Sequence, residues 1–575
     1  MKHINKFIFI LIALAAFTSC KKYFDINADP GSPQNADLAA ILPPILAGSG
    51  AQMAIDGGGA AVLSQNFTSN AGNGLLDIHS GNPGGGFATG FWRVFYVNQG
   101  TSINLILDKG ITNENWDYVG VAYAMRAWGF QQATSYFGDM PFYQAWDPTR
   151  ASFKYDKQED IYHGIDSLCR TAIDYLSRTD GKVSQSGLSR GDIVYKGDRS
   201  KWIKFVYGIL ARQYNRLTNK SNYISEGYAD SVIKFVGLSF SSSADNYLLP
   251  YPATKNDDTN PFGPARVNFN FNKQSRFVTH LLDGTIFSTP LGGTPPTTVP
   301  ISNRDPRLRS MLSISADTVT PSANMSPFNG GYRYNILAAT GGGDFEGNLT
   351  GGSTPGSPQW RRRPSVVYAD STPTNTGGSS TATPTFSIKA GRYIFQNNAP
   401  LTLMAYHELQ FILAEALYRR FGPAAAQPAY ENGVDKHFEF VNTYAALAGN
   451  TPPITSTQIA QYKTTPAFKN SANASTLTLT DIMLQKYIAD WAWNPYETWS
   501  DIRRYHYFDV DPVTNDQVYR SFVIPFYNTN NQGPKPAYRF LPTNFSEFDW
   551  NEAEIRRLGG FNIDYHTYEM WYSQP

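Results

Sequence analysis

The sequence predicts a mainly α fold, in which tetratricopeptide-like helical hairpins form a scaffold beside a loop-rich, irregular lobe. Apolar residues recur at helical spacing through much of segments 37–238 and 400–505. Residues 239–399 are instead rich in Gly, Pro, Ser, Thr and Asn, a composition typical of turns and short extended pieces. Aromatic residues are interspersed through that segment, whereas disordered segments are poor in them. We therefore expect residues 239–399 to form a lobe that folds against the helices. Residues 506–575 form a C-terminal segment after the second helical region.

The N-terminus has the three parts of a secretion signal. Two lysines precede an apolar run over residues 7–17, and the small residues Thr18 and Ser19 follow it. The run is shorter than the roughly 20 apolar residues that span a bilayer. Cys20 stands where a bacterial lipoprotein signal places its cysteine, so residues 1–19 are predicted to be a lipoprotein signal peptide and Cys20 the lipid anchor.

The other cysteine, Cys169, lies among apolar residues at helical spacing, so we expect it to be a core residue and exclude a disulfide framework. Two further stretches, 91–107 and 200–217, carry apolar residues at helical spacing. We expect Trp92, Trp128 and Trp202 to lie on such stripes and to pack in the core. Paired helices with short connections favour tetratricopeptide-like hairpins, although no clean 34-residue period is present.

The second helical region contains one motif that imitates a metal site. The stretch HELQF at 407–411 begins as a zinc-protease helix would, but Phe411 occupies the place of the second histidine. Glu408 and Glu415 are better interpreted as buried or half-buried acids, and Glu415 lies four residues before Arg419. Gly422 and Pro423 are predicted to end that helix.

A pair of helices is predicted over residues 479–508. Pro495 fits the first position of the second helix, with Asn494 as its cap and Glu497 in a position like that of a capping box.

Composition excludes several classes of function. Removing residues 1–19 leaves 46 basic and 47 acidic side chains, which does not predict a nucleic-acid partner. No later segment has the length and apolarity of a membrane span, so the lipid is the expected membrane attachment. The stretch DINADPG at 25–31 lacks the glycine and glutamate of a calcium loop. Because no motif for a nucleophile, a metal or a cofactor is found, we expect neither catalysis nor a cofactor.

Six stretches, in order along the chain, resemble the SusD/RagB-like family of nutrient-binding outer-membrane lipoproteins, in its SusD-like branch. They are SCKKYFDINADP (19–30), ATSYFGDMPFYQA (133–145), DPRLRSML (305–312), HELQFILAEAL (407–417), LQKYIADWAWNPYETWSDIRR (484–504) and RFLPTNFSEFDWN (539–551). The resemblance implies a surface-anchored protein that sits as a lid on a TonB-dependent, SusC-like outer-membrane transporter. It implies capture of glycan or, in some members, of peptide.

Ligand contacts are predicted in two places. The segment 66–92 combines amides, an acid, a Gly run and aromatics, the groups that hold sugars through hydroxyls and C–H faces. A second group lies in the irregular lobe, where no helical period requires aromatic side chains. The candidates are Asp77, Asn82, Phe87, Tyr332, Tyr334 and Trp360.

Three functions stay open at this point. The first is a nutrient-binding lid of an importer, for glycan or peptide. The second is an adhesion or scaffold protein that uses helical hairpins to hold other proteins. The third is a surface glycoside hydrolase, which needs two opposed carboxylates that no local motif marks.

Overall fold

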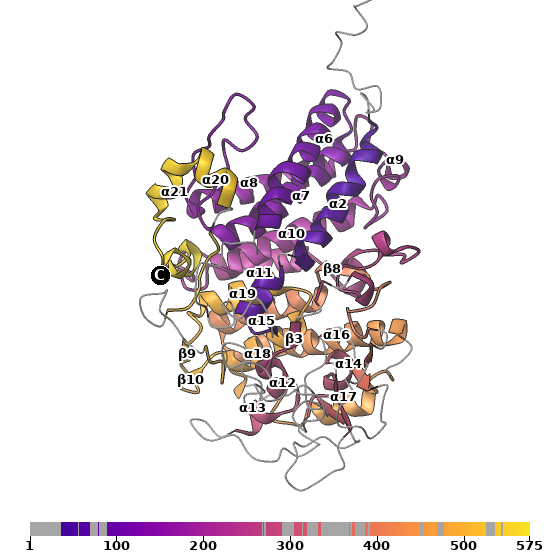
Figure 1. The fold of residues 1–575 in the computed structure, drawn as a ribbon, viewed down its shortest axis with the longest axis vertical. Helices are drawn as coiled ribbons and strands as arrows, with labels where there is room; N and C mark the ends of the chain where they lie inside the picture. Colours follow the sequence, from indigo (N-terminus) through magenta and orange to yellow (C-terminus); the bar gives the residue numbers. More distant parts are fainter. Residues whose placement is uncertain are drawn as a thin grey trace, which may run out of the picture.

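The computed structural model describes residues 36–55, 57–69, 79, 89–266, 268–269, 272–289, 304–312, 314–318, 332–334, 367, 371–373, 386–388, 391–448, 452–468, 476–524, 535–541 and 544–575. Helices dominate these residues and the strands are short, which confirms the mainly α prediction (Figure 1). The helices form an upper group from the N-terminal part of the chain and a lower group from the later part.

The upper group is built around α7, Trp116–Phe137. Nearly every residue of α7 is buried, because the helix is apolar or small on all sides and is enclosed by its neighbours. Helices α2 (Leu38–Ile55), α6 (Gly100–Thr112), α8 (Gln158–Ser177) and α10 (Arg199–Asn215) pack against α7. The N-terminal part of the chain also contains α5 (Thr89–Arg93), α9 (Gln185–Ser189) and α11 (Tyr228–Leu238), whereas α3 (Gly57–Leu63) packs against the later helix α19 (Pro495–Arg504).

A π-helical turn, η1 (Val94–Gln99), lies between α5 and α6. In η1 the Gly100 N–H donates to the carbonyl of Phe95, which leaves the carbonyl of Tyr96 available. The indole Nε1 of Trp146 donates to that carbonyl at 2.6 Å. A Cβ on Gly100 would lie 2.2 Å from the Trp146 ring, so glycine is what permits this approach.

The described part of segment 239–399 contains short helices and two-stranded pairs. The helices are α12 (Arg276–Leu282), α13 (Thr285–Ser288) and α14 (Leu308–Met311). All the strand pairs are antiparallel: β1 (Phe67–Ser69) with β3 (Asn272–Gln274), β2 (Tyr247–Leu249) with β8 (Leu401–Met404), β4 (Ile314–Thr318) with β5 (Tyr332–Tyr334), and β6 (Ser371–Pro373) with β7 (Phe386–Ile388).

The lower group begins with the hairpin of α15 (Tyr406–Phe421) and α16 (Pro423–Ala448). Gly422, at φ 88°, ends α15, as the sequence predicts, and α16 begins directly after it at Pro423. The remaining helices of this group are α17 (Ser456–Tyr462), α18 (Leu479–Asp490) and α19 (Pro495–Arg504), followed by the strand pair β9 (Val510–Asp511) and β10 (Asp516–Gln517).

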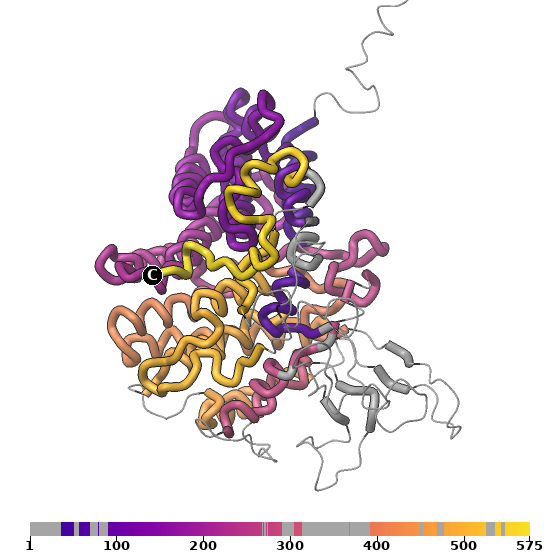
Figure 2. The backbone as a smooth tube through the Cα atoms, turned by 60° about the vertical axis from the view of Figure 1, so that its left-hand side comes forward, coloured from indigo at the N-terminus to yellow at the C-terminus, as the bar shows by residue number. Residues whose placement is uncertain are grey.

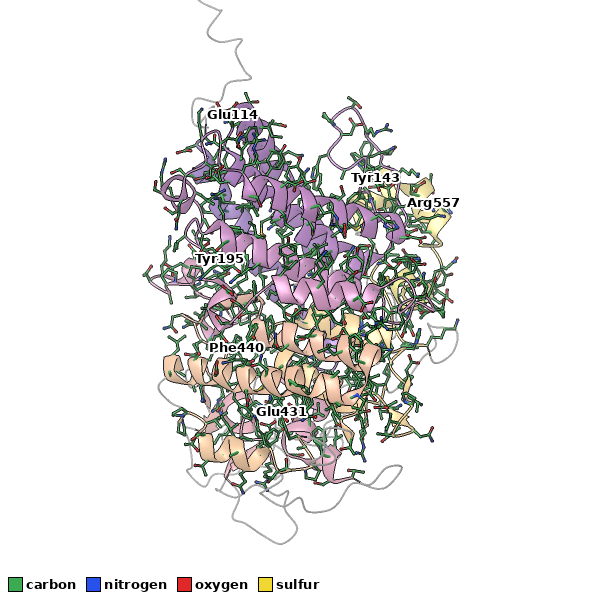
Figure 3. The ribbon with its side chains drawn as sticks, turned by 180° about the vertical axis from the view of Figure 1, so that it is seen from behind. Glu114, Tyr143, Tyr195, Glu431, Phe440 and Arg557 are labelled. Carbon is green, nitrogen blue, oxygen red and sulfur yellow. The ribbon has the colours of Figure 1, made fainter. Side chains whose placement is uncertain are left out.

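The C-terminal segment returns to the upper group, as Figure 2 shows for the yellow end of the chain. Its helices are α20 (Asn544–Trp550) and α21 (Glu552–Leu558). Arg557 Nη2 donates to the carbonyl of Tyr155 at 3.0 Å, and Arg557 and Tyr143 lie at the same corner in Figure 3. The chain therefore closes on itself through contacts between residues about 400 positions apart.

One continuous apolar core runs through both groups. Trp128 and Trp202 are fully buried and Trp92 nearly so, which confirms the core prediction for all three. Cys169 is buried as a free thiol, also as predicted.

Candidate functional site

The segment 66–92, predicted to contact ligand, is anchored by its described residues to distant parts of the chain. Asn66 accepts the N–H of Ala492 on its side-chain oxygen at 2.8 Å and the indole N–H of Trp491 on its carbonyl at 3.0 Å. At the far end, Trp92 packs edge-on against Phe137. The segment thus begins and ends on a rigid helical framework, an arrangement typical of binding loops.

His79 anchors the middle of this segment. The N–H of Ala537 donates to its Nδ1 at 3.1 Å, so Nε2 carries the hydrogen and donates to the carbonyl of Leu63 at 3.1 Å. Burial lowers the pKa of His79 to about 3, so the ring is neutral at physiological pH. Sequence reasoning missed this residue, because the pairing of its two nitrogens depends on backbone groups 16 and 458 positions away.

Most of the predicted ligand and anchor residues lie outside the part of the chain that the structure describes. Cys20, Asp77, Asn82, Phe87 and Trp360 lie outside the described residues. Tyr332 and Tyr334 lie in β5, where their backbones pair with Thr318 and Ile314 of β4. The structure therefore does not test whether the candidates converge, and they stay predictions.

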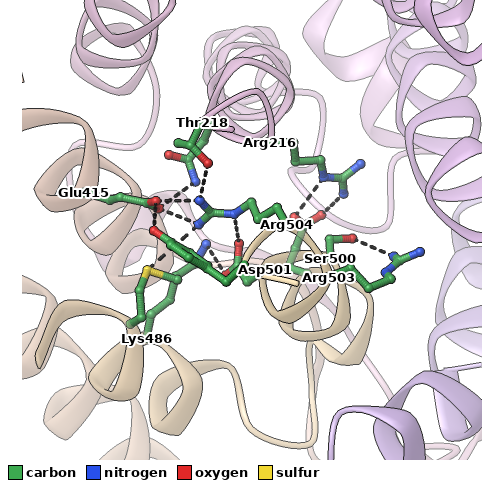
Figure 4. A network of polar contacts seen from close by, with 12 residues as sticks. Arg216, Thr218, Glu415, Lys486, Ser500, Asp501, Arg503 and Arg504 are labelled. Carbon is green, nitrogen blue, oxygen red and sulfur yellow. Dashed lines mark hydrogen bonds and ion pairs between the residues drawn. The ribbon is translucent and has the colours of Figure 1, made fainter. Parts of the chain in front are cut away.

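A buried network of charged side chains joins the two groups of helices, and Figure 4 shows its centre. Arg504 of α19 binds both carboxylate oxygens of Glu415 of α15 at 2.5 Å and donates from Nε to Asp501 at 2.9 Å. The same guanidinium donates to Thr218, in the turn after α10, at 2.6 Å. Lys486 of α18 lies 2.8 Å from the second oxygen of Asp501. One arginine thus links three segments far apart in sequence.

Two further arginines extend the network from α10. Arg212 binds both oxygens of Glu408, at 2.7 and 2.6 Å. Arg216 binds Glu497 of α19 and donates to the carbonyl of Gln131 of α7. Burial alone would raise the pKa of Glu497, but Arg216 and then Arg212 outweigh it and lower that pKa to about 2.

These contacts correct one prediction and confirm another. Glu497 does not act in a capping box, and Asn494 makes no side-chain cap on α19. The acid instead reaches across to Arg216, because a charged partner in a dry interior stabilises the carboxylate more than a backbone N–H does. Glu408 and Glu415 are buried, as expected, and Glu415 lies 3.3 Å from Arg419.

Asp490, at the end of α18, has a different environment within the same network. Both of its carboxylate oxygens are buried without a hydrogen-bond partner among the described residues. Burial, with Glu408 nearby, raises the pKa of Asp490 well above its ordinary value. A buried carboxyl without a hydrogen-bond partner is costly to ionise, so these surroundings favour the neutral form of Asp490.

A cleft of about 630 Å³ opens beside the network. One wall is the turn after α10, residues 218–224, and the other is formed by residues 505–518. Between the walls lie Tyr418, Arg419 and Leu479. The volume falls within the range of small-molecule sites, which is about 300–1,000 Å³. No sequence motif marked this cleft, because each wall is ordinary on its own and only folding places the walls together.

A second charged cluster stands at the rim of the cleft. His506 donates to Asp509 and to Glu569, each at 2.8 Å. Hydrogen bonds from the imidazole to Asp509 and then to Glu569 raise the pKa of His506 to about 10. All three side chains are partly exposed to solvent. The cluster ties the C-terminal segment to the end of α19.

Within the described ranges, no three His, Cys, Asp or Glu side chains are placed to hold a metal ion. Among the same residues, every helix falls short of the length or the apolarity that crossing a bilayer requires.

Comparison with known proteins was made at three levels. A family model, SusD-like, described as starch-binding and associating with the outer membrane, matches residues 61–284 and 371–526. No curated protein sequence matches the chain.

Solved structures with the same fold cover nearly the whole chain. A SusD/RagB family protein from Bacteroides thetaiotaomicron is 20% identical, with a TM-score of 0.62, and 94% of this chain and 99% of that chain are covered. A SusD homologue from Bacteroides fragilis is 20% identical, with a TM-score of 0.61 and coverage of 94% and 100%. A structure described as a chitin-binding protein is 20% identical, with a TM-score of 0.64 and coverage of 93% and 99%. At this identity the likeness shows the fold.

Proposed function

Because the chain belongs to the SusD-like family of outer-membrane-associated nutrient-binding proteins, we propose that it captures glycan at the cell surface and delivers it to a TonB-dependent, SusC-like transporter. Proteins of this family bind without catalysis, so the chain is not an enzyme. The observation that carries the proposal is the family match, which extends over both groups of helices. The starch-binding description of the family and the chitin-binding relative both favour glycan as the ligand class.

The proposed ligand site is formed by segment 66–92 together with the irregular lobe. Its candidate residues are Asp77, Asn82, Phe87, Tyr332, Tyr334 and Trp360. The fixed positions of Asn66, His79 and Trp92 support this location, because a binding loop needs a rigid base to limit the entropy lost on binding.

A binding panel tests the proposal. The purified mature protein is titrated calorimetrically with neutral oligosaccharides, including starch and chitin fragments, and with peptides, while product release is assayed in parallel. Glycan binding without turnover is the expected result. Peptide binding alone would favour the peptide-binding alternative, and binding of neither class would favour an adhesion or scaffold role.

A matched pair of tryptophan variants separates ligand contact from core packing. We expect Trp360→Ala to weaken glycan binding by about 1–3 kcal/mol while barely changing the melting temperature. We expect Trp202→Ala to lower the free energy of unfolding by about 3–5 kcal/mol, because its indole is fully buried and donates to Asp192. A large melting shift for Trp360→Ala with unchanged affinity would place that ring in the core of the lobe.

Attachment through Cys20 has its own test. Metabolic labelling with a fatty acid should mark the wild-type protein and not Cys20→Ala, since the diacylglycerol thioether needs the thiol. Labelled Cys20→Ala protein would show that the lipid is attached elsewhere. Retention of the transporter on affinity-tagged wild-type protein tests the partner.

A further inference from the structure

The cleft beside the buried network carries more positive than negative charge. Two of its lining side chains, Lys220 and Arg419, are cationic, whereas Asp509 is the anionic one. Asp509 is already engaged by His506. Lys220 donates to the carbonyl of Trp571 at 2.5 Å and lies 4.2 Å from that ring's centroid, with no carboxylate at ion-pair distance among the described residues.

Arg419 is only partly neutralised by the network beneath it. Its Nε lies 3.3 Å from Glu415, but both oxygens of that carboxylate are bound by Arg504. The other nearby acid, Asp501, is shared between Arg504 and Lys486. Three cations therefore share two carboxylates beneath the cleft, whereas at its rim the single cation His506 is shared by Asp509 and Glu569. The charges of these two clusters balance, so among the groups named here Lys220 supplies the net positive charge of the cleft.

The cleft also presents groups that suit a polyhydroxylated ring. One wall presents the Ser221 hydroxyl and the amide oxygen of Asn219, whose amide nitrogen already donates to the carbonyls of Arg504 and Ser573. The rings of Tyr418 and Tyr505 lie near the floor. Tyr223 also lines the cleft, and its buried hydroxyl has no hydrogen-bond partner among the described residues. A buried hydroxyl without a partner costs free energy that a ligand hydroxyl would recover.

We propose that this cleft is a second ligand site, distinct from segment 66–92, which binds an acidic saccharide through the carboxylate of a uronic acid unit. Lys220 and Arg419 bind the carboxylate, and the tyrosine rings and Tyr223 hydroxyl receive the sugar ring. The choice of a saccharide over another carboxylate rests on the proposed glycan-binding function.

The test uses the full mature protein and three probes: trigalacturonic acid, its trimethyl ester and a tripeptide with a free C-terminus. Trigalacturonic acid should bind about tenfold more tightly than the ester, and the difference should shrink at high salt, because exposed charges are screened. Equal affinity for acid and ester overturns the proposal. Tighter binding of the tripeptide, in competition with the saccharide, overturns the choice of saccharide.

Two variants place the binding in the cleft. Lys220→Gln should weaken trigalacturonate binding about tenfold, whereas Lys234→Gln, which removes an equal charge from the exposed side of α11, should leave it unchanged. Tyr223→Phe should weaken binding severalfold without lowering the melting temperature. Indistinguishable affinities for Lys220→Gln and Lys234→Gln, or for Tyr223→Phe and wild type, would exclude this cleft.

The same titrations distinguish a failure of this inference from a failure of the proposed function. Neutral glycan binding that is lost in Trp360→Ala but retained in Lys220→Gln supports the principal site whatever the acidic probe does. Binding of trigalacturonate that depends on Lys220, in a protein that binds no neutral glycan, would support the cleft and contradict the principal site.

Discussion

The two charged clusters of this protein contain similar groups in different surroundings. Around Arg504, the carboxylates of Glu415 and Asp501 are buried and each is bound by two cations. Around His506, three side chains make two hydrogen bonds of 2.8 Å but stay in contact with water. Ion pairs in a dry interior interact strongly and are costly to break, whereas water screens those at a surface.

The distances between the charged atoms alone therefore do not predict how much each cluster contributes to stability. The buried cluster joins α10, α15, α18 and α19, so its loss affects the packing of both groups of helices. The exposed cluster joins only the end of α19 to the C-terminal segment. We therefore expect the buried network to set the global stability and the His506 cluster to set a smaller, pH-dependent local stability.

The largest effect is expected for Glu415→Gln. This change leaves the Arg504 guanidinium without its bidentate partner, so we expect a loss of about 3–5 kcal/mol in the free energy of unfolding, measured in urea. Glu552→Gln is the control, because it removes an exposed ion pair with Arg556 on α21 and should cost less than about 0.5 kcal/mol. Equal losses in the two variants would contradict the comparison.

A smaller effect, which depends on pH, is expected for His506→Gln. The pKa of His506 in the folded protein is about 10, above its ordinary value of 6.5. Its contribution is therefore fully present below pH 6.5 and is lost as the pH rises through 10. We expect a loss of roughly 1 kcal/mol at neutral pH and none well above pH 10, from urea unfolding of wild type and variant in parallel.

The acid side of this profile follows from Glu569. Burial alone would raise its pKa, but the hydrogen bond from His506 outweighs that and lowers it below 4.5. The contribution is therefore present above about pH 4.5 and is lost as the pH falls through the lowered value. His163→Gln, on the exposed face of α8, should match wild type throughout. A loss independent of pH would show that the His506 ring acts by packing.

The smallest effect is expected for Asp490→Asn. Neither oxygen of Asp490 has a partner among the described residues, and burial raises its pKa and so favours the neutral acid. Replacing it by a neutral amide should therefore cost less than about 1 kcal/mol. Asp501→Asn is the same substitution at a buried aspartate that pairs with both Lys486 and Arg504, and it should lower the free energy of unfolding by about 3–5 kcal/mol.

The pH dependence of the free energy of unfolding tests the prediction for Asp490 more directly. A raised pKa makes the folded state bind more protons, so wild-type stability falls as the pH rises above the ordinary value of 3.8. Asp490→Asn removes this dependence, and its stability relative to wild type should improve with rising pH. A steady loss at every pH would mean that Asp490 is ionised and paired.

Some features of the structure follow from local sequence patterns, whereas others depend on distant residues. The helices ending at Gly422 and starting at Pro495, and the burial of Trp128 and Trp202, follow from local spacing and backbone preference. Glu497 was placed in the correct helix but given the wrong partner, since Arg216 is 281 positions away in sequence. A capping box is a local motif, and the sequence carries no sign that a distant guanidinium competes for the same carboxylate.

The mainly α fold class and the membership of the SusD-like family can be predicted from the amino-acid sequence, because helical periodicity and ordered motifs are properties of the chain. The sequence also placed the ligand candidates, whose convergence stays a prediction. Tertiary packing determines which carboxylates meet which arginines, and it encloses a cleft between residues 218–224 and 505–518. It also leaves Asp490 without a hydrogen-bond partner among the residues that the structure describes. These features depend on contacts between distant segments and on exclusion of water, and neither is encoded in any short stretch of residues.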